Sequence, residues 1–551
     1  MHRRFLNALT FMVAVSAGHA HQTKADSAAL TATQCANLAT VDFSATADAP
    51  TRIIATRSVE PSAVRPAYCE VNGYVAASVG FKLALPSERW NGKLMQLGCG
   101  GYCGTTEAGS TTPFECDDML RRGYACIVSD NGHRSNPRDA QWAYNNLQAE
   151  VDHAYRGVHV TALAGKAIVA RHYGYAPGKT YFMGSSTGGR LGLMAAQRFP
   201  WDFDGIVAGV PSLSVARIHI NLLWGNRVFT NAAGDPLLAR ADLDLLHDAV
   251  VTKCDLNDGV RDGLIGDPRA CAFDPAELTC KSSRTGCLSA RQIDVVNKLY
   301  GGPVTTRGES VFLPGALKGS ERTWTDWFNT QSPANPRLMR DFVREEFRYS
   351  AFDPDPGPGW QLDTFDFDRD PKRLGVMEAL YAAVNPDLRQ FRAAGGKLIS
   401  FAGWSDAGGM PLHTIDYYES VERVTGSREA TQNFFRLFVL PGMGHAYGDG
   451  AFAVDWLAYL EAWVEQGRAP DQLLSFHVKM DDLDLTSGGG RAEIYRRMTF
   501  PLDPKLIEFS RPAYPYPIQA KYLGHGDPRS AESFGPDVLG QAVTSNVGRA
   551  P

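Results

Sequence analysis

A serine within a glycine-rich pentapeptide is the clearest chemical signal in this sequence. Residues 184–188 match the pattern Gly-x-Ser-x-Gly, in which the serine lies on a sharp turn between a strand and a helix. An ordinary glycine-rich turn can match the same pattern, so the neighbouring sequence must distinguish the two interpretations. A short apolar run ends at Met183, and residues 190–198 have helical character. This context favours a nucleophile elbow with Ser186 as the nucleophile.

A serine hydroxyl needs a base and an acid that orients the base. In enzymes with this elbow the chain order is Ser, then Asp or Glu, then His. Asp406 follows an apolar run at 397–403, and His445 follows another at 435–440. A lone Asp after a strand is more often a turn former, and a lone His is more often a surface or packed residue. The order and the positions together predict that Asp406 and His445 complete a triad with Ser186.

The predicted roles follow from the chemistry of acyl transfer. His445 takes the proton of Ser186 and later gives it to the leaving alkoxide, while Asp406 holds the imidazole tautomer. The tetrahedral oxyanion needs donors that are already in place. The backbone N–H of Thr187 is one candidate, and the loop that contains Gly100 and Gly101 supplies the other.

The elements around these residues alternate between strand and helix, which predicts an α/β fold with a parallel sheet covered on both faces. This rhythm breaks between about 212 and 393, where Cys, Asp, Pro, Gly and Trp cluster. We therefore expect an α/β domain over 21–212 and 394–551, interrupted by an insertion over 213–393. The strands are expected at 68–86, 124–128, 180–183, 206–210, 397–403 and 435–440, and the helices at 151–171, 190–198 and 451–465.

An acidic loop lies inside the predicted insertion. Asp255, Asp258 and Asp262 are closely spaced and separated by Gly259 and Gly263. Carboxylates on a tightly turning loop suit a hard cation such as Ca²⁺, although the glutamate that ends an EF-hand loop is missing. A solvated acidic turn is the alternative.

Composition and targeting signals narrow the function classes. The chain has 551 residues, a formal net charge of −5 and no basic run, so neither a nucleic-acid nor a membrane partner is indicated. Arg3 and Arg4 precede an apolar stretch and small residues up to Ala20. This predicts a signal peptide over 1–20 and a secreted or periplasmic protein, with a buried N-terminal helix as the alternative. The oligomeric state stays open.

Ten cysteines fit an oxidising compartment. A zinc site is the competing interpretation, but no Cys-x-x-Cys pair occurs and no histidine lies close enough to complete a set. Disulfides are therefore favoured. The sequence leaves the pairing of four of them open, namely Cys99, Cys103, Cys116 and Cys126, although a bridge such as Cys103–Cys116 would stiffen the glycine loop.

With these residues in hand, the chain resembles the tannase/feruloyl esterase family of α/β-hydrolases, which also contains an enzyme that hydrolyses mono(2-hydroxyethyl) terephthalate. The resemblance runs from about Cys35 to about Phe534. It rests on residues 98–104, 130–133, 186–190, 403–406, 417–418, 436–445, 463–467 and 511–517. It implies the triad Ser186, Asp406 and His445. It also implies that 21–212 and 394–551 form an α/β-hydrolase catalytic domain and that the insertion over 213–393, after the strand that follows the elbow, is a lid domain.

The resemblance also implies ligands and disulfides. A structural Ca²⁺ in the lid would be held by Asp255, Asp258 and Asp262 and by the carbonyls of Val260 and Leu264. The implied disulfide pairs are Cys35–Cys69, Cys254–Cys271 and Cys280–Cys287.

This chain departs from the family pattern at several cysteines. The family has cysteines just before the nucleophile and just after the histidine, where this chain has Ser185 and Ala446. The C-terminal disulfide of the family is also missing, with Tyr514 at one of its positions. We therefore expect a divergent member that lacks the bridge between the triad loops.

The predicted function is that of a secreted serine carboxylic ester hydrolase acting on a small-molecule ester. The resemblance implies an aromatic acid of the feruloyl or galloyl type. Four tryptophans of the lid are candidates for the wall of an apolar pocket, with packing in the core as the alternative: Trp224, Trp324, Trp327 and Trp360. The alternatives are an esterase for other acyl, lactone or acetylated-sugar substrates, an acyl transferase, and a binding protein on the same scaffold.

Overall fold

The structure is a computed structural model that describes residues 32–107, 113–281, 285–329 and 338–537. The predicted signal peptide, residues 1–20, lies outside the described residues.

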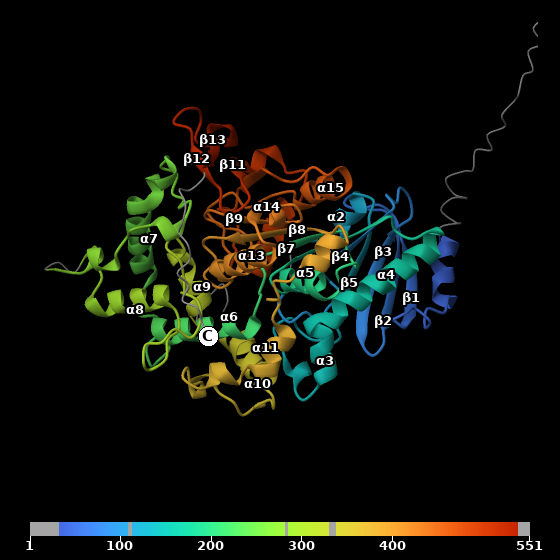
Figure 1. The fold of residues 1–551 in the computed structure, drawn as a ribbon, viewed down its shortest axis with the longest axis horizontal. Coiled ribbons are helices and arrows are strands. Elements are labelled where there is room, and N and C mark those ends of the chain that lie inside the picture. The colour runs from blue at the N-terminus through green and yellow to red at the C-terminus, as the bar shows by residue number, and fades with distance from the viewer. Residues whose placement is uncertain (1–31, 108–112, 282–284, 330–337, 538–551) are drawn as a thin grey trace, which may run out of the picture.

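Among the described residues, a nine-stranded mixed sheet forms the centre of the molecule, with the strand order β1-β2-β3-β5-β4-β6-β7-β8-β9 (Figure 1). Neighbouring pairs are antiparallel from β1 to β5 and parallel from β5 through β4 to β9. The bounds are β1 Thr51–Val59, β2 Tyr68–Val75, β3 Val79–Pro86, β4 Lys93–Leu97, β5 Ala125–Ser129, β6 Lys179–Ser185, β7 Gly205–Gly209, β8 Lys397–Gly403 and β9 Phe435–Leu440.

Helices cover both faces of this sheet, as the side chains of β7 show. Val207 packs in one apolar cluster with Leu460 of α15, whereas Ile206 packs in another with Leu191 of α5. Because successive side chains of a strand point to opposite faces, these two helices lie on opposite sides of the sheet. The helices that flank the sheet are α2 Cys116–Arg121, α3 Leu147–Val151, α4 Gly157–Tyr173, α5 Thr187–Arg198, α12 Arg389–Ala393, α13 Pro411–Thr425, α14 Arg428–Gln432 and α15 Trp456–Gln466.

The expected helix at 151–171 is present but not uniform. A π-helical turn, Asp152–Arg156, leads from α3 into α4. The helix ends at Tyr173 because Gly174 adopts a left-handed conformation, with φ of 85°, and its N–H bonds to the Ala170 carbonyl.

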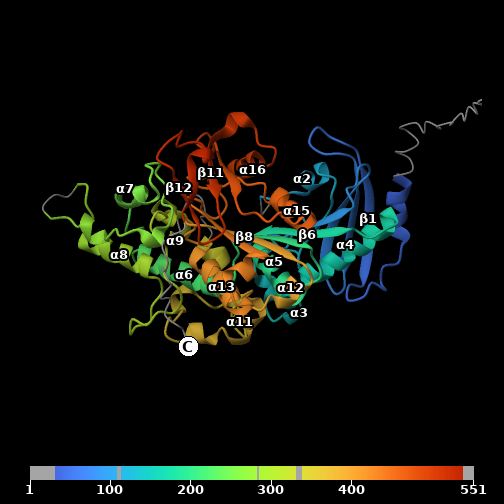
Figure 2. The same ribbon diagram turned by 45° about the horizontal axis from the view of Figure 1, so that its top comes forward.

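The long segment between β7 and β8 forms a lobe of its own. β7 and β8 pair in parallel register although residues 210–396 lie between them. The lobe has its own apolar cluster around Trp324 and Phe347, and Met410 from the loop after β8 packs into it. In Figures 1 and 2 its helices α7 and α8 lie at the opposite end of the molecule from β1. The domain limits 21–212, 213–393 and 394–551 stay a prediction. The helices of the lobe are α6 Val215–Phe229, α7 Arg240–Cys254, α8 Ala290–Gly301, α9 Trp324–Phe328, α10 Arg344–Tyr349 and α11 Gly375–Tyr381.

The C-terminal part adds small elements beside the carboxyl end of the sheet. Helix α16 spans Gly488–Arg497. β10 (Leu473–Val478) pairs with β11 (Ile507–Ala513), and β12 (Gln519–Tyr522) pairs with β13 (Phe534–Asp537), both antiparallel.

Five disulfides join all ten cysteines. The pairs Cys35–Cys69, Cys254–Cys271 and Cys280–Cys287 are those that the resemblance implies. The other four cysteines pair as Cys99–Cys103 and Cys116–Cys126. The Cys103–Cys116 bridge, which the sequence left as one possibility, is therefore not formed. Cys103 turns back onto the end of β4, while Cys116 begins α2, which packs on the strand that contains Cys126.

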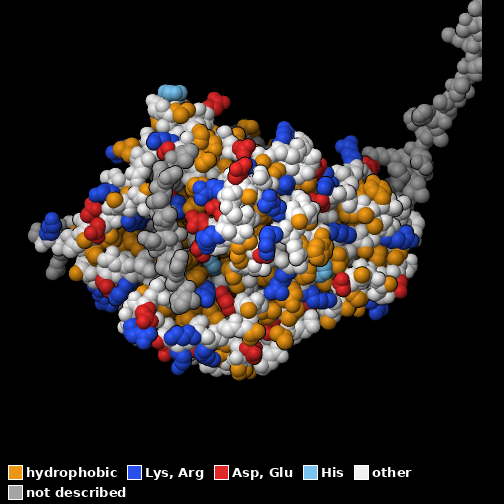
Figure 3. Space-filling view, viewed as in Figure 1, with side chains coloured by type: hydrophobic (Ala, Val, Ile, Leu, Met, Phe, Trp, Pro, Cys, Tyr) orange, Lys and Arg blue, Asp and Glu red, His pale blue; other side chains and the backbone are white. Residues whose placement is uncertain are grey.

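The surface carries charges of both signs. On the face in Figure 3, Lys and Arg side chains are interspersed with Asp and Glu. Within the described ranges, no helix combines the length and the apolar character that crossing a bilayer requires.

Candidate active site

Ser186 lies on a strained turn between β6 and α5. Its φ of 57° and ψ of −119° are unusual for a residue with a side chain, and such strain is typical of functional sites. The turn is so tight that a Cβ on Gly184 would lie 2.6 Å from the carbonyl carbon of Gly188. The small residues of the pentapeptide are therefore required by space, as a nucleophile elbow demands.

Asp406 and His445 meet beyond the carboxyl ends of β8 and β9. The Asp406 Oδ2 atom lies 2.7 Å from Nδ1 of His445. Oδ1 of the same carboxylate accepts the backbone N–H of Gly409 at 2.7 Å. Asp406 is buried, with an exposed fraction of 3%. The carboxylate is thus held in one orientation and fixes the imidazole beside it.

The environment sets the basicity of His445. Burial lowers the pKa of the imidazole, whereas the charge of Asp406 and its hydrogen bond raise it, and the net result is a pKa above the ordinary value of 6.5. A carboxylate partner that favours the imidazolium is the arrangement a general base needs.

Ser186 and His445 line the same cavity, which has a volume of about 530 Å³. Within the part of the chain that the structure describes, the hydrogen-bond partner of the Ser186 hydroxyl is Ser212 and not His445, with 3.4 Å between the two oxygen atoms. Catalytic hydrogen bonds are often long or misaligned in an empty site. Ser212 was missed from the sequence, although its place just after β7 is a signal of the same kind as those of Asp406 and His445.

The predicted oxyanion residues gather beside Ser186. Thr187 is the first residue of α5, where helical N–H groups have no partner within the helix. Its hydroxyl donates to the Gly101 carbonyl at 2.6 Å, which ties the helix to the glycine loop. Thr187, Gly100 and Gly101 all line the cavity, and the Cys99–Cys103 disulfide closes the loop. Their role as oxyanion donors stays a prediction.

Aromatic side chains form much of the cavity wall. Tyr102, Trp327, Phe342 and Tyr495 line it, and the Trp327 ring stands edge-on to the His445 ring with 5.4 Å between the centroids. Of the four tryptophans singled out in the sequence, Trp327 is the one that lines this cavity, whereas Trp324 belongs to the core of the lobe.

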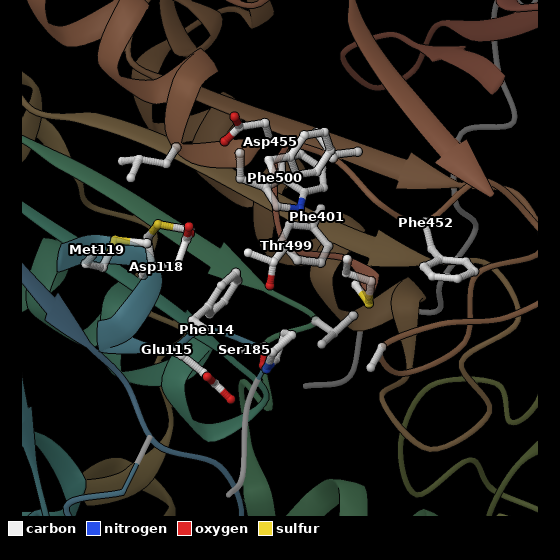
Figure 4. A pocket seen from close by; sticks show the side chains of 18 of the residues that line it. Phe114, Glu115, Asp118, Met119, Ser185, Phe401, Phe452, Asp455, Thr499 and Phe500 are labelled. Carbon is white, nitrogen blue, oxygen red and sulfur yellow. The ribbon is translucent and has the colours of Figure 1, made fainter. Parts of the chain in front are cut away.

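Ser185 also lines a second, smaller cavity of about 70 Å³. Figure 4 shows Ser185 near Phe114 and Glu115, with Phe401 and Phe500 further along the cavity. Ser185, His445 and Ala446 line both cavities. These include Ser185 and Ala446, the two positions at which the resemblance implies cysteines.

The acidic loop has the donor chemistry for calcium. Asp258, Asp262 and Leu264 line a cavity of about 40 Å³. Burial and the charge of Asp262 raise the pKa of Asp258 to about 7, so negative charge is crowded there. Arg511 already neutralises part of it, at 2.6 Å from Asp262 Oδ2.

The positions of the side chains in this loop suit calcium less well than their donor chemistry does. Among the residues that the structure describes, no three His, Cys, Asp or Glu side chains are grouped to hold a metal ion. The ligand set of Asp255, Asp258, Val260, Asp262 and Leu264 therefore stays a prediction.

Comparison with known proteins places this site in a family. Residues 62–536 match the family described as tannase and feruloyl esterase. The chain is 33% identical to mono(2-hydroxyethyl) terephthalate hydrolase of Piscinibacter sakaiensis, with 86% of this chain and 85% of that protein covered. It is 32% identical to an uncharacterised esterase of Xanthomonas campestris, with 85% and 84% covered.

A solved structure agrees with this assignment. Feruloyl esterase B from Aspergillus oryzae superposes with a TM-score of 0.75 at 24% identity, over 92% of this chain and the whole of that one. At this identity the likeness shows the fold. The chain therefore belongs to the tannase and feruloyl esterase family and is a carboxylic ester hydrolase with the α/β-hydrolase fold.

Proposed function

We propose that this enzyme hydrolyses small aromatic carboxylic esters through a triad of Ser186, His445 and Asp406. The observation that carries the proposal is the Asp406–His445 pair, 2.7 Å apart, beside a cavity that Ser186 also lines. An oriented base next to a serine on a strained elbow is the arrangement that activates a hydroxyl.

The reaction proceeds in two halves. The Ser186 oxygen attacks the ester carbonyl while His445 takes the serine proton, and the oxyanion is stabilised by backbone N–H groups at Thr187 and the glycine loop. His445 then protonates the alkoxide, which leaves as the alcohol and gives the acyl-enzyme. Water attacks the acyl carbonyl as His445 takes its proton. The serine oxygen finally leaves with that proton, which frees the acid.

Two observations support an aromatic acid as substrate. The cavity wall is rich in aromatic side chains, which pack well on planar rings. Relatives carry names that refer to aromatic esters, such as the terephthalate hydrolase and a probable feruloyl esterase of Aspergillus flavus, 31% identical over 74% of this chain.

The test is hydrolysis of p-nitrophenyl acetate, methyl ferulate, methyl gallate and mono(2-hydroxyethyl) terephthalate by the wild type and Ser186→Ala. We expect turnover of the acetate and of at least one aromatic ester, with a loss of about 10⁴-fold or more in the variant. Ser420→Ala, at a half-buried position of α13 that does not line the cavity, is the matched control. Turnover of the acetate alone would contradict the aromatic substrate, and turnover that survives in Ser186→Ala would contradict the triad.

We also propose that the acidic loop binds a structural Ca²⁺. Crowded carboxylates around a small cavity support this, and calcium would stabilise the folded state by about 2.7 kcal/mol at one hundred times Kd. Thermal unfolding is measured with calcium and with EGTA. We expect a higher Tm with calcium in the wild type and in Asp294→Asn, a surface control, and no calcium response in Asp258→Asn. Equal Tm values in the wild type would refute the site.

We propose, further, that the enzyme acts outside the cytoplasm after removal of residues 1–20. Five disulfides support an oxidising compartment. N-terminal sequencing of the mature protein is expected to begin near His21, whereas retention of Met1 would count against a cleaved signal.

A further inference from the structure

A buried histidine on the cavity wall has hydrogen-bonding capacity that the protein leaves unused. His219 lines the substrate cavity with an exposed fraction of 6%. Its Nδ1 has no hydrogen-bond partner, and burial lowers the pKa of the imidazole to about 3. The ring is therefore neutral at ordinary pH, with one nitrogen as donor and the other as acceptor. Such a group suits a neutral polar part of a ligand.

A carboxyl group behind the ring selects its tautomer. Glu346 Oε2 lies 3.7 Å from Nδ1 of His219. The same oxygen accepts hydrogen bonds from the hydroxyls of Tyr102 at 3.1 Å and Ser350 at 3.0 Å. Because this Glu346 oxygen acts as an acceptor toward its neighbours, it favours the His219 tautomer that carries its hydrogen on Nδ1. The other ring nitrogen, Nε2, is then a hydrogen-bond acceptor.

The position of His219 suits the far end of an acyl group. Val215, Ile218, His219 and Leu222 of α6 all line the cavity, at the spacing of one helix face. The helix begins three residues after Ser212, the partner of the nucleophile. His219 lies about 6 Å further along the axis than Val215, at ~1.5 Å per residue. An aromatic ring of the substrate bound between Val215 and His219 would point its far edge toward His219.

Apolar groups surround this polar group. The Phe342 ring lies near the Tyr102 and His219 rings, with centroid distances of 5.4 Å and 6.4 Å. Ile218 and Leu222 flank the histidine on its own helix. An apolar slot with one acceptor discriminates strongly, because a ligand that lacks the matching donor leaves the acceptor unpaired.

We propose that His219, oriented by Glu346, is a specificity-determining residue that accepts a hydrogen bond from a ring hydroxyl on the acid part of the substrate. This inference rests on the proposed function and narrows it to esters of phenolic acids. Tyr102 belongs to the glycine loop, and its hydroxyl lies near Glu346 and 2.8 Å from the Phe342 carbonyl of the lobe. Tyr102 therefore links the glycine loop to this subsite.

The test compares methyl 4-hydroxycinnamate with methyl cinnamate, which differ by one hydroxyl. We expect the wild type to prefer the hydroxylated ester in kcat/KM by about tenfold or more. His219→Leu should bring this ratio below about threefold, while His219→Gln, which keeps a polar end, should retain part of it. His172→Leu is the matched control, because His172 on α4 is partly buried, has an unpartnered Nδ1 and does not line the cavity.

A second variant covers the case in which His219→Leu does not fold. Glu346→Leu removes the oxygen that faces Nδ1, so the tautomer with Nε2 as acceptor is no longer favoured. The preference for methyl 4-hydroxycinnamate over methyl 4-methoxycinnamate should then fall by about threefold or more.

Two results would overturn the subsite. One is equal turnover of the hydroxylated and plain cinnamates by the wild type, and the other is a ratio that survives in His219→Leu. Ser186-dependent hydrolysis of p-nitrophenyl acetate shows whether the triad works regardless of the subsite. If the wild type shows no Ser186-dependent hydrolysis of the acetate, the proposed function is contradicted. If it hydrolyses the acetate but turns over the two cinnamates equally, the subsite alone is contradicted.

Discussion

The carboxylate of Asp406 is held from two directions, by Nδ1 of His445 at 2.7 Å and by the backbone N–H of Gly409 at 2.7 Å. The first bond crosses from the loop after β8 to the loop after β9. The second lies within the β8 loop and directs the carboxylate toward the histidine. Asp406 and His445 are thus already paired, while the Ser186 hydroxyl bonds to Ser212.

Asp406→Asn is expected to lower kcat/KM by about 10⁴-fold. The amide keeps the shape but no longer favours the tautomer with hydrogen on Nδ1, nor does it stabilise the imidazolium. Hydrolysis of p-nitrophenyl acetate measures the loss, and the Tm shows whether the fold persists. A loss below about tenfold in a folded variant would remove Asp406 from the triad.

The pH profile of kcat/KM should show an acid limb with a midpoint above pH 6.5. Burial lowers the pKa of His445, but Asp406 raises it further, and the net shift is upward. Since the base acts only when neutral, activity is lost as pH falls through this pKa. In Asp406→Asn the raising effect disappears, so the residual activity should show a lower midpoint. An unchanged midpoint in that variant would contradict this origin of the limb.

Gly409→Ala is expected to reduce kcat by about tenfold or more with little change in Tm. A Cβ at this position would lie 2.0 Å from Asp406 Oδ2 and would push the carboxylate away from His445. Misplacement of a catalytic group by about 1 Å costs rate in this range. Gly359→Ala is the control, because its Cβ would meet nothing within 4 Å. Equal kcat values for the two variants would contradict the steric argument.

The Cys99–Cys103 disulfide should matter for catalysis as well as stability. Replacing both cysteines by alanine is expected to lower the free energy of unfolding by about 2 kcal/mol, because short loops gain that much from closure. It should also lower kcat, since the closed loop carries the predicted oxyanion donors.

The Cys280–Cys287 pair offers a matched comparison. It closes a loop of similar size in the lobe, and neither cysteine lines the substrate cavity. Its removal is expected to give a similar stability loss with kcat retained. Chemical denaturation and initial rates separate the two effects, and an equal kcat loss in both double variants would show a general rather than a local cause.

Much of the active site was accessible from the sequence because its signals are local. Each predicted triad residue follows an apolar run, and β8 and β9 have the predicted bounds, 397–403 and 435–440. The carboxyl ends of parallel strands meet at one edge of a sheet. Knowing the strand ends was therefore enough to bring Asp406 and His445 together. The elbow was equally local, since small residues at 184 and 188 are a steric requirement of the turn.

What the sequence alone determined, then, is which candidate residues stand at the strand ends and in the elbow, and in which order, because strand ends, turns and short motifs depend on neighbouring residues. The tertiary structure decided what lies around them. Which cysteines pair, how Ser212 approaches Ser186 and how Glu346 lies behind His219 depend on segments far apart in the chain. Such contacts are fixed by how the lobe between β7 and β8 packs back on the sheet, and packing of this kind leaves no periodic pattern in the residues themselves.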